Sequence, residues 1–336
     1  MTDRNLFAQQ RRNRRRSVLL VVVFLLFFAW IGFGGDLIMA ITTADAGRDA
    51  YHHVFPWFGS GATLLATGMA WHGWRNGPKS ILWATGAWEL AKGTSPEEQT
   101  LVNVVEEMAI ASGLPRPSVW IVPEKDPNAF ATGTDEHHSH IAVTEGLLTT
   151  LTREELQGVV AHEMAHIRNH DVKLMTLLAA LVGVMALISD GVFRTGRHGR
   201  IRLRSGSSDK KGLGPLLLAV WLVSVLLAPI VSRLLALAVS RKREYLADAS
   251  AAQFTRNPAA LADALRKIED AAHPTAAIHR GSAHLCIADP LGRRSSAREG
   301  WLADVLGTHP PMAVRVARLK AMAYQLDKTG TLPEAV

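Results

Sequence analysis

Long uncharged stretches alternate with polar segments along the chain, and they predict membrane helices. Residues 17–35 hold 19 uncharged residues, which at about 1.5 Å per residue nearly cross a hydrocarbon core of about 30 Å. Residues 54–74 form a second, more polar stretch that carries three tryptophans. Two further stretches lie at 174–189 and 213–232, and the second of these contains two prolines. We expect about four transmembrane helices, although the last two stretches are also short enough for buried core helices.

The polar segments show the patterns of a folded domain of α+β class that is mainly α. Short runs of apolar and β-branched residues at 119–122 and 140–143 predict strands of a small sheet. Thr152 with Glu155 three residues later forms a capping box, which predicts the start of a helix. Two further helices are expected at 255–272 and 312–326. The predicted organisation is an N-terminal membrane region (1–74), a first block of the folded domain (75–173), a membrane hairpin (174–237) and a second block (238–336).

The basic charge of the chain is confined to two short segments. The formal net charge is +7 and 20% of the residues are charged. Residues 1–16 carry +5 and residues 194–211 carry +6, so the rest of the chain is mildly acidic. A nucleic-acid-binding domain is basic across a whole face, so this distribution argues against nucleic-acid binding. The single cysteine, Cys286, excludes a disulfide scaffold.

The two basic clusters disagree about topology. The arginines before residue 17 favour a cytoplasmic N-terminus and a retained anchor rather than a cleaved signal peptide. If all four stretches span the membrane, both blocks of the folded domain are cytoplasmic, but the basic loop 194–211 lies outside, against the charge rule. If the second stretch does not span, the charge rule holds and the domain is exported. A third topology has the last two stretches entering the membrane without crossing it.

The helix predicted from Thr152 carries a metal-binding pattern. His162 and His166 are four residues apart, so both imidazoles project from one face of the helix. Two ring nitrogens at this spacing can bind one zinc ion at about 2.0–2.1 Å. Glu163 lies beside the first histidine, where it can act as general base toward a water at the metal.

A second helical segment supplies a third ligand. Glu244 and Asp248 are again four residues apart, directly after the last apolar stretch. The Glu244 carboxylate can complete a set of three protein ligands, which leaves a position open for water, as catalytic zinc sites require. Asp248 can accept a hydrogen bond from a metal-binding histidine and fix its tautomer. Without the upstream histidines, these residues would be read as a solvated charged face.

Several motifs together resemble one family of proteases. HEMAH at 162–166, a hydrophobic hairpin and SRKREYLAD at 240–248 are similar to HtpX-type membrane zinc metalloproteases, bacterial relatives of the CAAX prenyl proteases. The resemblance also includes SPEE at 95–98, PNAFATG at 127–133 and THPP at 308–311. It runs from about residue 95 to residue 319, whereas the stretch 54–74 departs from the family pattern in being polar and rich in Trp and His.

The resemblance implies a gluzincin, a zinc endopeptidase with one zinc ion per chain. His162, His166 and Glu244 are then the zinc ligands and Glu163 is the catalytic base. The family implies protein substrates, cleaved on the cytoplasmic side of the bacterial plasma membrane in quality control of misfolded or damaged membrane proteins. Two alternatives remain: a narrow processing protease of the CAAX type, and a membrane protein that binds zinc without proteolysis.

Further residues are expected near the reaction. Asn128, Ala129 and Phe130 lie in a segment where an edge strand commonly binds the substrate backbone. His309, held between Thr308 and two prolines, is a candidate for stabilising the oxyanion of the transition state. Tyr245, beside Glu244, is a second candidate for the same role.

Overall fold

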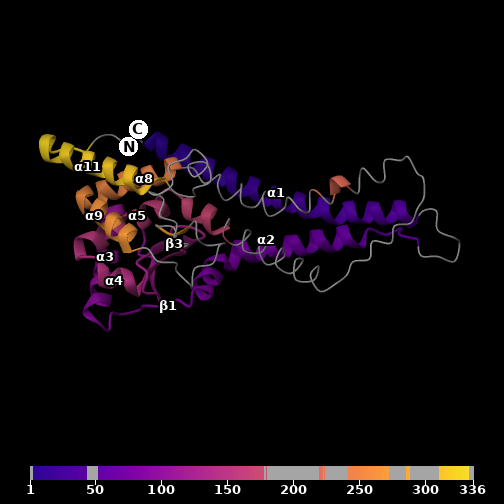
Figure 1. The fold of residues 1–336 in the computed structure, drawn as a ribbon, viewed down its shortest axis with the longest axis horizontal. Helices are drawn as coiled ribbons and strands as arrows, with labels where there is room; N and C mark the ends of the chain where they lie inside the picture. Colours follow the sequence, from indigo (N-terminus) through magenta and orange to yellow (C-terminus); the bar gives the residue numbers. More distant parts are fainter. Residues whose placement is uncertain are drawn as a thin grey trace. The chain divides into compact units, whose positions relative to one another are not determined.

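The structure is a computed structural model, and it describes residues 3–43, 52–177, 179, 219–221, 223, 241–271, 285–287 and 310–332 (Figure 1). These residues divide into two compact units. The helical-hairpin unit contains residues 18–72 with 219–221 and 223, and the metal-site unit contains the other described residues. The basic loop 194–211, His309 and most of the stretches predicted at 174–189 and 213–232 lie outside the described residues.

Helix α1 (Asp3–Thr43) includes the first predicted membrane stretch and continues beyond its expected end. Within the part of the chain that the structure describes, one segment is long and apolar enough to cross a membrane, Ser17–Ile41, with a mean hydropathy of 2.6. The predicted stretch ends at residue 35 because Asp36 is charged. In the structure the Asp36 side chain is buried and accepts hydrogen bonds from His53 Nε2 at 2.7 Å and Gly59 N at 2.6 Å. The helix therefore passes through the acidic position.

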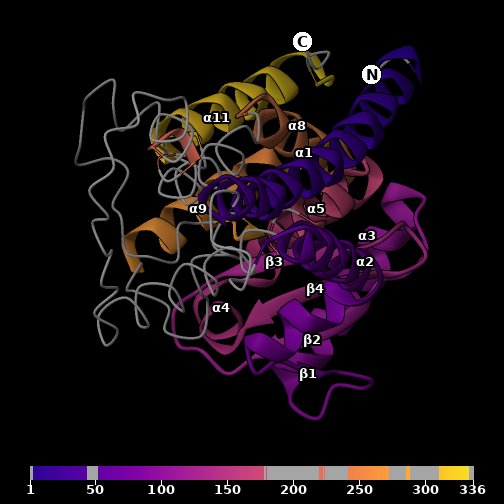
Figure 2. The same ribbon diagram turned by 90° about the vertical axis from the view of Figure 1, so that its right-hand side faces the viewer.

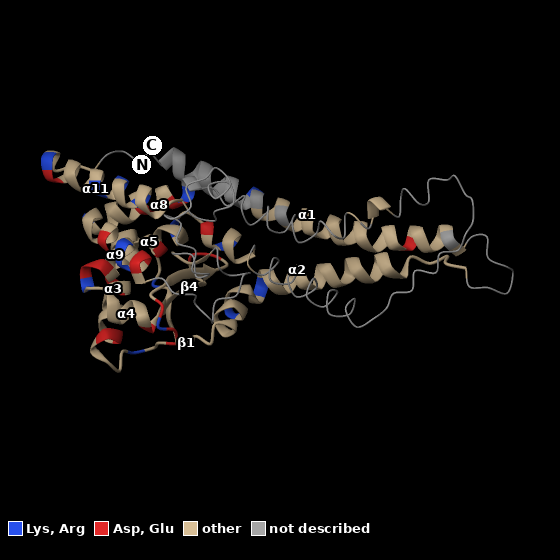
Figure 3. Ribbon diagram, viewed as in Figure 1, with Lys and Arg blue, Asp and Glu red and all other residues tan. Residues whose placement is uncertain are grey.

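Helix α2 (Trp57–Ala84) begins beside Asp36, whose carboxylate accepts hydrogen bonds from the first turn of the helix. The carboxylate accepts from the backbone N–H groups of both Phe58 and Gly59, which have no partner inside a helix. Charged residues are sparse along residues 17–43 of α1 and along α2 (Figure 3). The expected count of four transmembrane helices stays a prediction.

The metal-site unit contains a four-stranded mixed sheet (Figure 2). Its strands are β1 (Trp88–Glu89), β2 (Ser118–Val122), β3 (Ala129–Gly133) and β4 (Ser139–Thr144), in the order β1-β2-β4-β3. The two predicted strands are confirmed as the central pair, β2 and β4, which run parallel. β3 lies at one edge, antiparallel to β4.

Helices make up most of the rest of this unit, so the class is mainly helical with a small mixed sheet. They are α3 (Pro96–Ser112), α4 (Glu145–Thr150), α5 (Arg153–Arg168), α8 (Arg241–Thr255), α9 (Pro258–Ala271) and α11 (Met312–Thr329). α4 and α5 contact the sheet, and α5 is central and packs against α3, α8 and α9. The α5–α9 approach depends on Gly158, where an added Cβ would lie 3.0 Å from Leu261 Cα.

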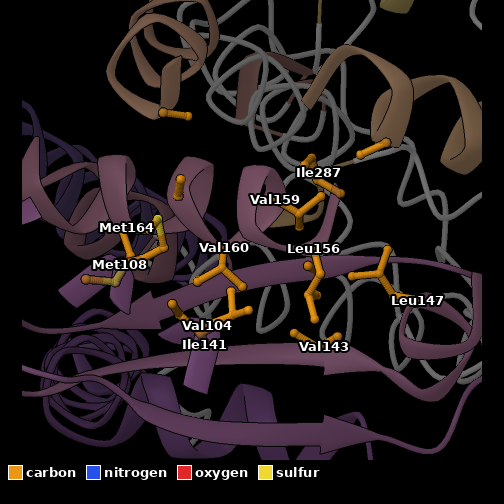
Figure 4. Packing of buried hydrophobic residues seen from close by; sticks show 14 of the residues in the cluster. Val104, Met108, Ile141, Val143, Leu147, Leu156, Val159, Val160, Met164 and Ile287 are labelled. Atoms are coloured by element: carbon orange, nitrogen blue, oxygen red, sulfur yellow. The ribbon is translucent and has the colours of Figure 1, made fainter. Parts of the chain in front are cut away.

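Both faces of α5 are buried, which fixes the helix that carries the candidate metal ligands. On the face toward the sheet, Val160 lies beside Val104 and Ile141 (Figure 4). On another face, Val159 lies beside Ile287, which comes from far along the chain. Fully burying one side chain of this kind contributes about 1.5–3 kcal/mol relative to leaving it in water. The core thus holds α5 rigidly between the sheet and the C-terminal helices.

Candidate active site

Helix α5 begins at the predicted capping box. Thr152 Oγ1 accepts from Glu155 N, and the Glu155 carboxylate accepts from Thr152 N. With its start fixed and no proline inside, the helix continues through His162 and His166, whose Nε2 atoms lie 3.2 Å apart. The predicted alignment of the two imidazoles on one helical face is therefore present.

Glu244 on α8 faces both histidines. Its Oε2 lies 3.6 Å from His162 Nε2 and its Oε1 lies 3.6 Å from His166 Nε2. Glu244 and His162 are buried, and His166 is partly buried. The structure thus brings together the three expected ligands from two helices that are almost eighty residues apart in the chain.

The spacing of these three side chains fits a tetrahedral metal ion. Ligand atoms about 2.0–2.1 Å from a zinc ion lie about 3.3–3.4 Å from one another in a tetrahedron. The Nε2 atoms of His162 and His166 lie 3.2 Å apart, and a different oxygen of Glu244 lies 3.6 Å from each. With one oxygen of Glu244 taken, the three ligand atoms lie within 4.8 Å of one another. Two imidazole nitrogens and one carboxylate oxygen are also a donor set that zinc accepts.

A carboxylate lies near the Nδ1 atom of each of the two histidines. His162 Nδ1 lies 3.0 Å from Asp248 Oδ1, and His166 Nδ1 lies 3.4 Å from Asp171 Oδ2. A hydrogen bond donated from Nδ1 fixes the tautomer that leaves the Nε2 lone pair available to a metal. The sequence predicted this role for Asp248, and the structure adds Asp171 in the same position toward His166.

Two buried arginines accompany these carboxylates. Arg315 on α11 binds Asp248, and Arg243 Nη1 on α8 lies 3.7 Å from Asp171 Oδ1. Among the described residues, the charged side chains buried around the site are four carboxylates and two guanidiniums: Glu163, Glu244, Asp248, Asp171, Arg243 and Arg315. When these six are ionised and the histidines are neutral, as metal ligands must be, they leave an excess of two negative charges, which a single divalent cation balances. The charge of the site therefore fits a metal ion as well as its geometry does.

Burial and hydrogen bonding shift the protonation of these groups. Burial disfavours charge on His162, but hydrogen bonds to Asp248 and Glu244 outweigh it and raise the pKa of His162 to about 9. Burial raises the pKa of the Glu163 carboxyl above its ordinary value, and the neighbouring His162 and His166 offset this only in part. A raised pKa suits a carboxylate that must both take and return a proton.

A pocket opens onto the three candidate ligands. Besides them it is lined by Ala131 of β3, Glu163, Val172 and Met175, and by the short segment Leu285–Ile287. Glu163 is 1% exposed and accepts a hydrogen bond from the backbone of Ala131. The proposed base and the edge strand therefore meet at the pocket.

The edge of β3 is already occupied within the chain. Ile287 N donates to Ala129 O at 2.9 Å, and Phe130 pairs with Cys286 in an antiparallel bridge. Asn128 is buried, with its backbone N–H donated to Thr144 Oγ1. The three residues expected to bind substrate thus lie next to the pocket, but Ala129 and Phe130 pair with the segment Leu285–Ile287.

Neither of the two residues expected to stabilise the oxyanion is among the described residues that line the pocket. The Tyr245 ring lies under the Arg318 guanidinium, 3.9 Å from ring centroid to Cζ, and is not among the residues lining the pocket. His309 lies outside the described residues.

Sequence reading missed the connection of Arg315 to the site. One feature of the sequence indicates that Arg315 is buried: it shares one face of α11 with the apolar residues Met312, Val316 and Leu319. A charged residue in an apolar stripe needs a buried partner, which identifies the position but not the partner.

Comparisons with known proteins agree with this geometry. The profile of Peptidase family M48 matches residues 95–323. The chain is 39% identical over 272 residues to a protein named "Protease HtpX homolog" of Thermoanaerobacter pseudethanolicus, covering 80% of this chain and 87% of that one. It is 42% identical over 262 residues to a protein of the same name from Tropheryma whipplei, covering 78% and 84%.

A solved structure is also similar, more distantly. The crystal structure of S. mikatae Ste24p matches with a TM-score of 0.45 and 16% identity, covering 90% of this chain and 66% of that one. The family assignment rests on the profile, which spans most of the chain, and on identities near 40% to the bacterial relatives. The chain belongs to peptidase family M48 and is a membrane metalloprotease.

Proposed function

We propose that the chain is a zinc endopeptidase in which His162, His166 and Glu244 hold one zinc ion and Glu163 is the catalytic base. The observation that carries this proposal is the convergence of the three ligand atoms, which lie within 4.8 Å of one another, beside a buried glutamate at the pocket. A zinc ion held by these residues would lower the pKa of the attacking water and polarise the scissile carbonyl. Glu163 takes the proton from the attacking water and passes it to the leaving amine nitrogen.

The remaining side chains prepare the ligands for this role. Asp248 and Asp171 accept hydrogen bonds from the Nδ1–H groups of His162 and His166 and so orient the two rings. An apolar wall of the pocket, formed by Ala131 and the segment Leu285–Ile287, lies beside Glu163. This wall excludes bulk water from the Glu163 carboxylate.

The substitution Glu163→Gln tests the base. The introduced amide retains the shape of the carboxylate but cannot accept the proton, so cleavage of an unfolded protein substrate should fall roughly 10²–10⁴-fold while bound zinc is unchanged. The matched control is Glu154→Gln, an exposed glutamate on the same helix, which should cleave normally. Retained cleavage by the Glu163→Gln variant would refute the assignment.

Substrate binding at β3 requires a rearrangement of the edge. If the substrate backbone pairs with Ala129 and Phe130, the segment Leu285–Ile287 must first leave that edge, because both use the same backbone groups. Phe130→Cys places a thiol opposite the native Cys286, at the Cα separation of an antiparallel pair, which suits a disulfide.

Oxidation of the Phe130→Cys variant should then abolish cleavage, and reduction should restore it. The control combines Phe130→Cys with Cys286→Ala, in which oxidation should change nothing. Full activity of the disulfide-locked protein would show that substrate binds elsewhere in the pocket.

The biological role is proposed from the family. We infer a multi-pass protein of the bacterial plasma membrane with its protease domain in the cytoplasm, acting on misfolded or damaged membrane proteins. The test is to profile cleavage sites in unfolded membrane proteins: broad cleavage supports quality control, whereas one defined motif supports a processing protease of the CAAX type.

A further inference from the structure

Arg315 is the largest fully buried side chain among the described residues of the metal-site unit. It lies on α11 with 0% of its surface exposed, between the apolar residues Met312, Val316 and Leu319 on the same buried face. A guanidinium in such a position is strongly unfavourable unless it is paired and hydrogen-bonded. Its partners therefore indicate why the charge is there.

Its main partner is Asp248, which it binds through two parallel hydrogen bonds. Arg315 Nε donates to Asp248 Oδ2 at 2.9 Å, and Nη2 donates to Asp248 Oδ1 at 2.7 Å. This bidentate geometry fixes the plane of the carboxylate. A carboxylate fixed in this way cannot rotate away from its third contact, His162.

The same Asp248 oxygen faces a candidate metal ligand. Asp248 Oδ1 lies 3.0 Å from His162 Nδ1, so the guanidinium and the imidazole N–H converge on one acceptor. The two hydrogen bonds from the Arg315 guanidinium pair Asp248 as a carboxylate. An ionised Asp248 can only accept, which directs the proton of His162 to Nδ1 and its lone pair to the metal side.

Arg315 reaches two further parts of the site. Its Nη1 lies 3.7 Å from Glu244 Oε2, so it also balances the charge of the third ligand. The same nitrogen donates to the Ile287 carbonyl at 3.2 Å, and Ile287 N in turn binds Ala129 of β3. One side chain thus contacts the support of a histidine ligand, the carboxylate ligand and the pocket wall.

We propose that Arg315 is a positioning residue that orients His162 through Asp248, contacts Glu244 directly and holds Leu285–Ile287 against β3. This inference rests on the proposed metal site. It assigns the C-terminal helix α11 a direct part in the reaction geometry, although α11 contributes no group that touches the reacting atoms.

The test compares Arg315→Met with Arg315→Lys in the full-length protein in lipid nanodiscs. Readouts are the zinc dissociation constant by chelator competition, the visible absorption spectrum of the Co²⁺-loaded protein, and kcat separately from KM. For Arg315→Met we expect zinc binding weakened about 10–100-fold, a changed Co²⁺ spectrum and a lower kcat with KM little changed. Arg315→Lys retains the charge without the bidentate geometry and should recover part of the affinity.

A matched control and a second variant keep the test decisive. Lys320→Met removes an exposed positive charge from the same helix and should leave every readout unchanged. If Arg315→Met does not fold, Arg315→Met with Asp248→Asn removes the charge pair together, and the same loss of affinity and spectral change are expected. Wild-type zinc affinity and Co²⁺ spectrum in either folded variant would overturn the inference. Absence of metal binding by the unaltered chain would instead overturn the proposed function, and this inference with it.

Discussion

The two units differ in how far the large apolar side chains named here are exposed. In the metal-site unit, apolar residues such as Leu101 and Ile141 are fully buried. In the helical-hairpin unit, Leu26 is 64% and Leu64 is 77% exposed, while the charged Asp36 is buried. The contrast is the one expected when a water-solvated fold and a lipid-solvated hairpin occur in one chain.

A buried aspartate–histidine contact occurs in both units, with different consequences. In the hairpin, Asp36 contacts His53 and also accepts from the start of α2, so its neighbours are structural backbone groups. In the metal-site unit, Asp248 contacts His162, whose other nitrogen faces the ligand cluster. The same pair of residue types therefore accepts the hydrogen bonds of a helix start in one region and contacts a proposed metal ligand in the other.

The largest difference in stability between the two units is expected when a lysine replaces one exposed apolar residue in each of them. Leu26→Lys should destabilise membrane insertion by about 2.5–3.5 kcal/mol if Leu26 faces lipid. Ile110→Lys is the matched change, because Ile110 is 83% exposed on α3 in the metal-site unit; it should change stability by less than about 0.5 kcal/mol.

The measurement is resistance to alkaline extraction from membranes, together with thermal unfolding in nanodiscs. Equal extraction and equal thermal stability of the Leu26→Lys and Ile110→Lys variants would contradict the view that lipid solvates the hairpin unit and water the metal-site unit.

An intermediate effect is expected at Asp36. Asp36→Ala removes the acceptor for His53 and for the N–H groups of Phe58 and Gly59, and should cost about 1–3 kcal/mol of hairpin stability. Zinc affinity should not change, because the metal-site unit keeps all its contacts. Unfolding in detergent and chelator competition measure the two quantities; Thr67→Ala, an exposed α2 hydroxyl, is the control.

The smallest effect is expected at the start of α5. Thr152→Ala removes one side of the capping box and should destabilise the metal-site unit by about 1 kcal/mol. The histidines lie about three turns further along a helix that is packed on both faces, so zinc affinity should remain near that of the unaltered chain. Chemical denaturation measures the loss, and a large drop in zinc affinity would show that the helix is less rigid than its packing implies.

Local sequence patterns predicted much of the site. The capping box at Thr152, the strands around 119–122 and 140–143 and the four-residue spacing of Glu244 and Asp248 are local features, and each is present in the structure. The helices expected at 255–272 and 312–326 correspond to α9 and α11.

Contacts between distant segments could not be predicted in the same way. Arg315 reaches Asp248 across 67 residues, and Ile287 reaches Ala129 from a still more distant part of the chain, so no periodicity connects these pairs. At Asp36 the missing long-range contacts made the prediction wrong. The charge of Asp36 suggested that the membrane helix ends there. Its buried partners, His53 in a loop and Gly59 at the start of α2, have no sequence pattern that connects them to it.

The most direct test of the account is the zinc content of four proteins purified identically in lipid nanodiscs: the unaltered chain, Glu163→Gln, His166→Ala and Glu244→Ala. If His162, His166 and Glu244 are the ligands and Glu163 acts on water, the first two proteins contain one zinc per chain. The other two should then lose the metal on dialysis against a weak chelator. Zinc retained at one per chain after His166→Ala or Glu244→Ala, or lost after Glu163→Gln, would contradict the account.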